Sequence, residues 1–277
     1  DVLKQKPPQI TLITSCSGHT ETISSVKFSF LYKSTSLNDF FALSAGRDRV
    51  LKKWYIGQYI TSKTKKSVQS VQNVPCQSIV AHDKEINAVC VNKTNTLIAT
   101  CSLDKSIKLW KNTPKSQGTL KLLYTLKGHK RGVWDCSFSP VSSVLATCSG
   151  DKTIKLWSLD DYTCLKTLQG HNLPVLGITF FNKGLQLVSY GADALIKIWN
   201  IKTNENITTI DEIHTDRIWA MDLIELEKNP HSSGSENYVE KKMITGGADG
   251  QLIQWKDITY IELLKKDEIK KKNLLSS

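Results

Sequence analysis

The sequence predicts an all-β fold built from five repeated units of short antiparallel strands. In the 277 residues, an Asp is followed six residues later by a Trp five times, and a Ser or Thr stands four residues before each of these Asp residues. The segment "TIKLW" (153–157) is β-branched and aromatic with the alternation of a half-buried strand. Repetition at a regular spacing indicates a protein assembled from similar structural units.

A His precedes each of these sets, so every unit contains four residue types in the same order. The five sets are His19, Ser44, Asp48 and Trp54; His82, Thr100, Asp104 and Trp110; His129, Thr147, Asp151 and Trp157; His171, Ser189, Asp193 and Trp199; and His214, Thr245, Asp249 and Trp255. Successive Trp residues of the sets are 42 to 56 residues apart, which suits four short strands in each unit. The units are therefore predicted to be blades of a β-propeller, centred near 19–54, 82–110, 129–157, 171–199 and 214–255.

The repeated His, Ser/Thr and Asp residues have the composition of a catalytic triad, but their number indicates a structural role. A hydrolase uses one triad, whereas this chain contains five copies. A buried imidazole needs a partner for each ring nitrogen, which the Asp and the hydroxyl are expected to provide, and the hydroxyl is expected to bridge to the Trp indole. No other polar cluster, phosphate-binding Gly-rich loop or metal-ligand spacing is present, so neither an enzyme nor a cofactor is expected.

The segment "GHKRGVWDCSFSPVSSVLATCSGDKTIKLWSL" (128–159) resembles a WD40 repeat almost position by position. The stretches "HDKEINAV", "DDYTCLKTLQGH", "IKTNE" and "QWKDIT" resemble the second propeller of the transducin-β-like family of nucleolar proteins. That resemblance implies a scaffold of the small-subunit processome, the assembly that processes pre-ribosomal RNA around a small nucleolar RNA. It also implies a nuclear and nucleolar location, protein subunits of a large assembly as partners, and no small-molecule substrate.

The chain also departs from that family, whose members have two propellers and a helical C-terminal domain. It is therefore expected to be a fragment, with a propeller over residues 1–260 and a basic tail over residues 261–277. Because WD40 rings usually have seven blades, the five repeats are expected to form an open arc or part of a seven-bladed ring. The segment "QITLITS" (9–15) is a candidate to complete the last blade by pairing with "QLIQW" (251–255).

Composition and charge restrict the partners further. The formal net charge is +11, and much of it lies in "TSKTKKS" (61–67) and "KKDEIKKKN" (265–273), which have the pattern of solvated loops. Weak, sequence-independent contact with RNA is expected from these segments.

No apolar run is long enough to span a membrane and no signal peptide is evident, so an intracellular protein is expected. The seven cysteines are expected to be small buried hydrophobic residues, and no zinc site is expected.

Two tryptophans lie outside the repeated sets, and both stand five residues after a repeat His. They are Trp134 and Trp219, with Arg131 and Arg217 nearby. The corresponding residues in the other repeats are Ser24, Asn87 and Leu176, a position predicted to line the mouth of the central channel. The two Trp either pack against neighbouring blades or, with the arginines, form a partner-binding site. The second interpretation allows an alternative function, a peptide-recognition module such as a chromatin reader or a ubiquitin-ligase substrate receptor.

The repeats differ in length at particular places. The His is 18 residues before the Ser or Thr in three repeats, but 25 and 31 residues before it in the first and last repeats. The added residues are polar, as in "EKNPHSSGSENYVEK" (227–241), and are predicted to form loops on the face opposite the His and Asp turns.

Overall fold

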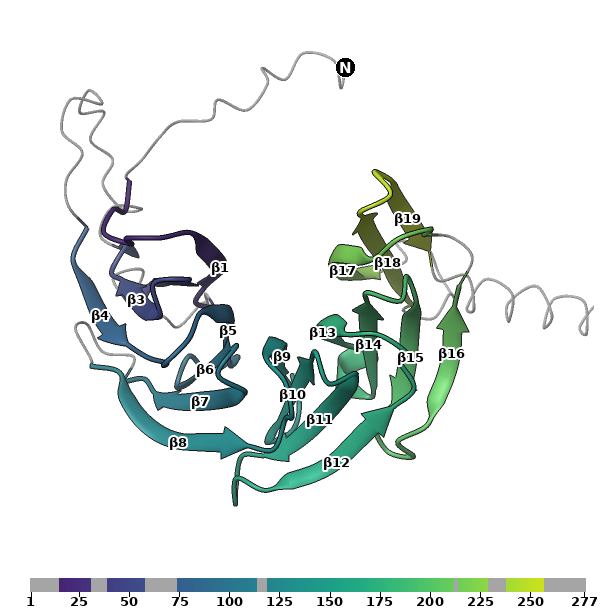
Figure 1. Cartoon of the computed structure of the whole chain (residues 1–277), viewed down its shortest axis with the longest axis horizontal. Coiled ribbons are helices and arrows are strands. Elements are labelled where there is room, and N and C mark those ends of the chain that lie inside the picture. The colour runs from purple at the N-terminus through teal and green to yellow at the C-terminus, as the bar shows by residue number, and fades with distance from the viewer. Residues whose placement is uncertain are drawn as a thin grey trace, which may run out of the picture.

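The protein is an open arc of five antiparallel β-sheets. A computed structural model describes residues 15–30, 39–57, 74–113, 119–211, 214–228 and 238–256. Each sheet is one blade, and the blades stand side by side in an open arc (Figure 1). The prediction of an all-β fold with five blades is confirmed.

Four of the sheets have four described strands each. Blade 1 contains β1 (Ile23–Phe28), β2 (Ala42–Gly46), β3 (Val50–Trp54) and β4 (Cys76–Val80). Blade 2 contains β5 (Ile86–Val91), β6 (Leu97–Ser102), β7 (Ser106–Lys111) and β8 (Lys121–Lys127). Blade 3 contains β9 (Val133–Phe138), β10 (Val144–Ser149), β11 (Thr153–Ser158) and β12 (Cys164–Gln169). Blade 4 contains β13 (Val175–Phe181), β14 (Gln186–Gly191), β15 (Ile196–Asn200) and β16 (Asn206–Ile210), with a short 3-10 turn (Asn182–Gly184) after β13.

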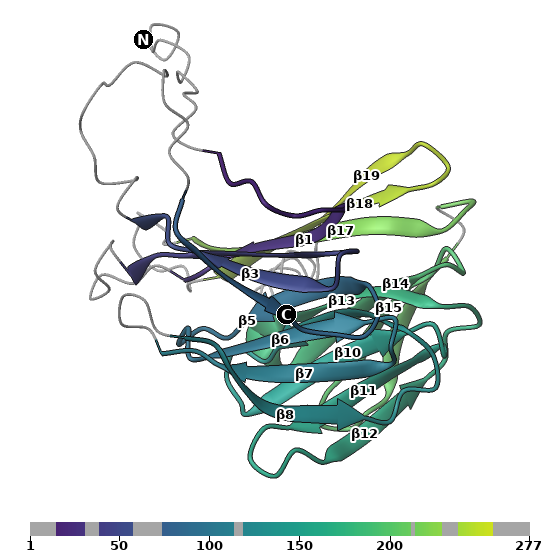
Figure 2. The same ribbon diagram turned by 60° about the vertical axis from the view of Figure 1, so that its left-hand side comes forward.

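Blade 5 has three described strands, β17 (Ile218–Lys228), β18 (Tyr238–Gly247) and β19 (Leu252–Lys256). Any fourth strand of this blade lies outside the described residues, as does the segment 9–14 that the sequence offers for it. In every blade the first strand is innermost, and each inner strand contacts the inner strand of the next blade. The strands β4, β8, β12 and β16 lie on the outer rim, and Figure 2 shows β8 and β12 on the outside from a second direction.

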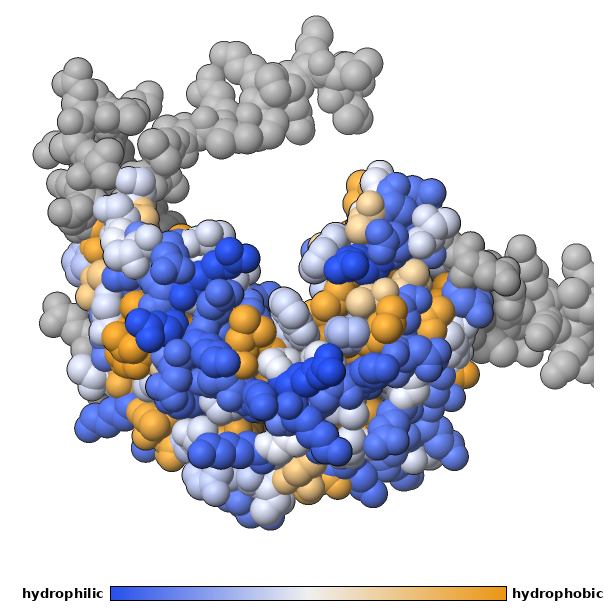
Figure 3. All heavy atoms as spheres, viewed as in Figure 1, coloured by the Kyte–Doolittle hydropathy of each residue, from blue (hydrophilic) through white to orange (hydrophobic). Residues whose placement is uncertain are grey.

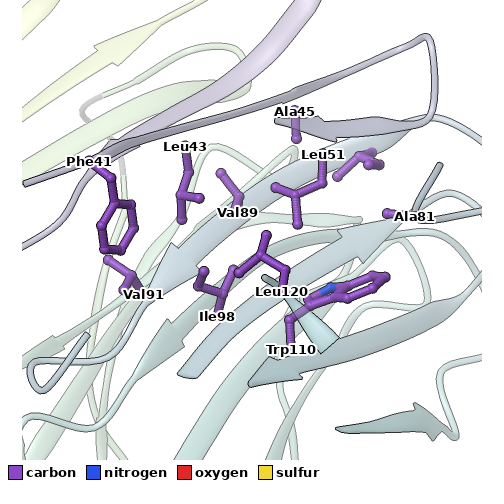
Figure 4. Close-up of a cluster of buried hydrophobic side chains, with 11 residues drawn as sticks. Phe41, Leu43, Ala45, Leu51, Ala81, Val89, Val91, Ile98, Trp110 and Leu120 are labelled. Atoms are coloured by element: carbon purple, nitrogen blue, oxygen red, sulfur yellow. The ribbon is translucent and has the colours of Figure 1, made fainter. Parts of the chain in front are cut away.

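Most of the hydrophobic core lies between blades, and one small cluster, Ala42, Trp54 and Val74, lies within blade 1. Phe41, Leu43 and Leu51 of blade 1 are each at most 2% exposed and pack against blade 2 (Figure 4). Val89 and Ile98 provide part of the facing surface of blade 2. A strand that is buried on both faces has few polar positions, which explains the apolar runs "NAVCV" and "LIATCS". Each blade is therefore stabilised by its neighbours.

The His turns and the Asp turns lie at the same end of every sheet. The start of each inner strand pairs with the end of the second strand, as Ile23 does with Gly46. We call the surface formed by these turns the Asp-turn face; it consists of residues 18–22 and 46–49, 81–85 and 102–105, 128–132 and 149–152, 170–174 and 191–194, and 214–217 and 247–250. In each blade the residue after the Asp has a positive φ, from 61° to 76°: Arg49, Lys105, Lys152, Ala194 and Gly250. Left-handed residues at this place allow a tight turn between the second and third strands.

The two ends of the arc leave apolar side chains uncovered. In β1 of blade 1, Val26 is 54% exposed and Phe28 is 62% exposed, whereas the corresponding strand β5 is almost entirely buried. At the other end, Trp219 is 54% exposed and Ile224 is 50% exposed. The space-filling view shows that the arc remains open between these ends when side chains are included (Figure 3). The five described blades do not close into a ring.

Two expectations from the sequence are corrected. The prediction that 227–241 is a loop is wrong at both ends, because β17 continues to Lys228 and pairs there with Tyr238 of β18. The alternating pattern of "LIELEK" and "YVEKKMI" extends this hairpin, and the polar residues between them lie outside the described ranges. The cysteines are not uniformly buried: Cys90, Cys101, Cys136 and Cys148 are buried, whereas Cys16, Cys76 and Cys164 are exposed.

The described residues include no helix that is both long and apolar enough to cross a membrane. The basic segments 61–67 and 265–273 lie outside the described residues.

Candidate functional site

The repeated His, Ser/Thr, Asp and Trp residues form one hydrogen-bonded chain in every blade. The distance from the His Nδ1 atom to the Asp carboxylate is 2.7 to 2.9 Å in all five blades. The His Nε2 atom lies 2.7 to 2.9 Å from the Ser or Thr hydroxyl oxygen. The indole Nε1–H of the Trp donates to the same hydroxyl oxygen at 2.8 to 3.0 Å. The structure thus brings together all twenty residues of the repeated sets.

The chemistry of the partners determines two of the hydrogen-bond directions. An indole can only donate, so the hydroxyl oxygen accepts from Trp. An ionised carboxylate can only accept, so the His Nδ1–H donates to the Asp. Every polar group of the chain has a partner, and such chains are stronger than isolated hydrogen bonds.

Backbone N–H groups complete the environment of each carboxylate. In blade 3, Asp151 accepts the N–H of Lys130 at 2.8 Å and the N–H of Thr153 at 3.0 Å. Burial of Asp151 favours its neutral form, but the hydrogen bonds from His129, Thr153 and Lys130 outweigh burial and hold the pKa of this carboxyl well below its usual range. The same balance lowers the pKa of Asp104 in blade 2. Each Asp is therefore ionised at neutral pH and fastens the His turn to the Asp turn.

The burial of the hydroxyl groups argues against catalysis by these sets. Thr100, Thr147, Ser189 and Thr245 are 0% exposed and Ser44 is 4% exposed. A nucleophile must reach a substrate, and each of these oxygens instead has the His on one side and the indole on the other. In the described residues, no group of three His, Cys, Asp or Glu side chains is arranged to hold a metal ion.

A second set of contacts joins each blade to the next. The Ser24 side chain donates to the carbonyl of Ile86, and the Asn87 side chain donates to the carbonyl of Val133 at 2.8 Å. Both donors stand five residues after a His, and both acceptors stand four residues after the His of the next blade. The position that was predicted to line the channel mouth therefore also makes the junction between blades.

The next residue along the inner strand, six residues after the repeat His, also bonds to the inner strand of the next blade. Ser25 accepts the N–H of Val89 at 3.2 Å, and Asp135 accepts the N–H of Ile178 at 3.0 Å. Burial raises the pKa of Asp135 to about 7. The sequence does not reveal these contacts, because the residue types at these positions differ from blade to blade.

Trp134 and Trp219 occupy the same junction position in blades 3 and 5. Trp134 is half-buried and packs against the cluster shared with blade 4, which includes Ile178. Trp219 belongs to the last blade and is 54% exposed. The guanidinium carbon of Arg217 lies 5.5 Å from the centre of the Trp219 ring. Packing against this cluster thus covers part of the Trp134 side chain. Trp219 is exposed instead and lies beside the guanidinium of Arg217.

Comparison with protein-family models identifies the repeats. Residues 73–111, 120–158 and 162–200 each match the model described as "WD domain, G-beta repeat". The chain contains WD40 repeats. The three matched WD40 repeats overlap blades 2, 3 and 4, and blades 1 and 5 have the same hydrogen-bonded sets. WD40 propellers generally serve as interaction modules.

Curated relatives match part of this chain. Rat transducin beta-like protein 3 is 36% identical over 131 residues, which are 47% of this chain and 15% of the relative. The human protein of that name is also 36% identical, over 130 residues. U3 small nucleolar RNA-associated protein 13 of Saccharomyces cerevisiae is 38% identical over 97 residues, which are 35% of this chain and 11% of the relative. The matched region thus corresponds to a small part of each relative.

Solved structures support the fold. The structure of U3-55K matches with a TM-score of 0.62 at 20% identity and covers 87% of this chain and 62% of that chain. The RRP9 WD40 repeats match with a TM-score of 0.63, also at 20% identity. At this level of identity the likeness shows the WD40 propeller fold alone.

We predict that Asp151→Ala lowers the free energy of unfolding by about 1–3 kcal/mol, because it leaves a buried His129 Nδ1–H without its acceptor. Asp104→Ala, in another WD40 repeat, should lower the free energy of unfolding by a similar amount. Chemical denaturation measures both, and Asp160→Ala, at an exposed position, is the matched control. A D151A protein as stable as the control would contradict the structural role of the network.

The same carboxylates predict how stability depends on pH. The folded protein holds the pKa of Asp104 and Asp151 below the value of 3.8 expected for the unfolded chain. Their contribution to stability is therefore complete above that pKa and is lost as the pH falls through it and below. Denaturation curves from pH 6 to pH 2 should show a shallower loss of stability for Asp151→Asn than for the unchanged protein. Parallel curves would show that the Asp151 carboxylate has the same pKa in both states.

Proposed function

We propose that this chain is a non-catalytic scaffold that holds protein subunits in the nucleolar assembly that processes pre-ribosomal RNA. The observation that carries the proposal is the 38% identity over 97 residues to a protein named for its association with the U3 small nucleolar RNA. The buried hydroxyl groups of the five networks support the non-catalytic part, because no described set offers a nucleophile to a substrate.

Affinity purification of the tagged chain from its native cells tests the proposed function. We expect U3 small nucleolar RNA and the proteins bound to it to co-purify, and the tagged chain to be found in the nucleolus. Recovery of histones or of ubiquitin-ligase subunits without this RNA would support the alternative, a peptide-recognition module in another assembly, and would contradict the proposal.

The uncovered ends of the arc support a further part of the proposal, that additional blades complete a seven-bladed ring in the assembly. The four junctions in the structure bury the faces of neighbouring blades, whereas Val26 and Trp219 remain exposed at the two ends. In the same purification, Val26→Glu should reduce recovery of the partners. Val141→Glu is the matched control, because Val141 is 67% exposed and lies outside the end faces. Equal recovery of partners with both variants would contradict the proposal that an additional blade covers the exposed face of β1.

RNA contact is proposed to be weak and to depend on the lysine-rich segments. Binding of the purified chain to polyuridylate should fall steeply as salt rises, because lysines that contact phosphates release counterions. Replacing Lys63, Lys65 and Lys66 with Gln should reduce the slope of log affinity against log salt by up to about 2 units. Fluorescence anisotropy measures the slope. Tight binding to one RNA sequence that persists at high salt would contradict this proposal.

A further inference from the structure

Three buried thiols lie together where blade 2 meets blade 3. Cys90 is on β5, Cys101 on β6 and Cys136 on β9, and all three belong to the hydrophobic cluster that the two blades share. Their side chains are well covered, since Cys90 is 7% exposed, Cys101 0% and Cys136 4%. A buried free cysteine usually serves as a small hydrophobic residue, so burial alone assigns these thiols no function.

Two of the sulfur atoms face each other across the junction. Sγ of Cys90 lies 3.2 Å from Sγ of Cys136. Cys90 pairs with Ala99 in the sheet of blade 2, and Sγ of Cys136 also lies 3.9 Å from the Ala99 carbonyl oxygen. Two contacts therefore place the Cys136 sulfur against the same part of blade 2. Because the S–S bond of a disulfide is about 2.0 Å long, the two sulfur atoms need to approach by only about 1.2 Å to bond.

The inner strands that carry the two thiols are fixed to each other nearby. The Asn87 side chain donates to the carbonyl of Val133 at 2.8 Å, three residues before Cys90 on one strand and three residues before Cys136 on the other. The small side chains of Ala88 and Ala99 belong to the same cluster as the thiols. The backbone thus keeps the thiols opposite each other, and small neighbours allow the sulfur atoms to move together.

The other junctions are built without facing thiols. Cys90 stands eight residues after the His of blade 2, and Cys136 stands seven residues after the His of blade 3. The same two positions hold Lys27 and Val89 for blades 1 and 2, Ser137 and Ile178 for blades 3 and 4, and Thr179 and Met221 for blades 4 and 5. The packing of neighbouring blades therefore does not require a thiol at either position.

The surroundings of the thiols distinguish the sulfur that reacts first. The hydrogen bonds of the Cys101 and Cys90 thiols to Cys136 lower the pKa of Cys136 against the effect of burial. Burial raises the pKa of Cys90 and of Cys101. Since the thiolate is the form that reacts with oxidants, Cys136 is expected to be the nucleophile.

We infer that Cys90 and Cys136 are a redox-active dithiol, which hydrogen peroxide converts into a disulfide between blades 2 and 3. The Cys136 sulfur attacks one peroxide oxygen and the O–O bond breaks, so that Cys136 becomes a sulfenic acid and the departing hydroxide takes up the Cys136 proton as water. The Cys90 sulfur then attacks the Cys136 sulfur, the S–O bond breaks, and the hydroxide leaves with the Cys90 proton as a second water. One peroxide is reduced to two waters while two thiols are oxidised to one disulfide.

The disulfide would join two WD40 repeats covalently. Its ends lie 46 positions apart, so it would restrict the unfolded chain and make the folded chain harder to unfold. Hydrogen peroxide is small and uncharged, which suits thiols that are at most 7% exposed. The inference does not rest on the proposed scaffold role, because the purified chain alone tests it.

The experiment maps disulfides in the full chain after exposed Cys16, Cys76 and Cys164 have been replaced with Ser to exclude their reactions. The folded chain is treated with hydrogen peroxide, its remaining thiols are alkylated, and it is digested with trypsin without reduction. We expect the peptide 85–93, which contains Cys90, to be linked to the peptide 132–152, which contains Cys136, until dithiothreitol separates them. Alkylation of both peptides after peroxide treatment, with no link between them, would overturn the inference.

Alanine variants identify the two sulfur atoms. The peptide 132–152 also contains Cys148, a buried thiol in the cluster at the next junction, so Cys148→Ala is the matched control and should retain the link. Cys90→Ala and Cys136→Ala should each abolish it, and Cys101→Ala should retain it. A link that persists in C136A, or one that is lost in C101A and kept in C90A, would show that the pair is wrongly assigned. Thermal unfolding before oxidation confirms that each variant is folded.

Unfolding by urea tests whether the disulfide fits the native junction. Oxidation should raise the urea midpoint of the chain and of C148A, and dithiothreitol should reverse this rise. The midpoint of C90A should not rise. A lower midpoint after oxidation of the chain would contradict the inference, because the bond would then form only by distorting the junction between the blades.

Discussion

The propeller depends on the need of one buried imidazole in each blade for two hydrogen-bond partners. The ring can satisfy both nitrogens only where the His turn, the Asp turn and the second strand meet. The Trp of the third strand then supplies the remaining donor to the hydroxyl. Four residues separated by as many as 41 positions, as from His214 to Trp255, thus fix three strands and a turn in one arrangement. Because the groups are buried, a missing partner costs more than the bond itself contributes.

The junctions between blades follow from this arrangement. Once the network has fixed the start of each inner strand, the side chains that follow it face the inner strand of the next blade. The apolar faces of neighbouring blades then bury each other, as Leu43 of blade 1 and Ile98 of blade 2 do. Most of the buried apolar surface of a blade faces its neighbours, so the exposed Val26 and Trp219 follow directly from the open arc.

The sequence predicts the features that repeat and does not predict those that occur once. The His, Ser/Thr, Asp and Trp sets could be predicted because one geometry requires the same residue types in every blade. The junction contacts could not, because Ser24, Asn87 and Trp134 hold the same position with different chemistry and meet residues more than 40 positions away. The last hairpin was predicted as a loop because its polar composition concealed the alternation that extends β17 and β18. The approach of Cys90 to Cys136 likewise needed the packing of blades 2 and 3 to be known.

The most direct test of the central claim is hydrogen exchange of the seven indole N–H groups, followed by NMR of the Trp side chains. If the network is the structural core of each blade, the indole N–H groups of Trp54, Trp110, Trp157, Trp199 and Trp255 exchange slowly, since each donates to a Ser or Thr hydroxyl. Those of Trp134 and Trp219 should exchange rapidly. Similar exchange rates for all seven would contradict the account, because the indole donors of the repeated sets would then be no better protected than the two that stand outside them.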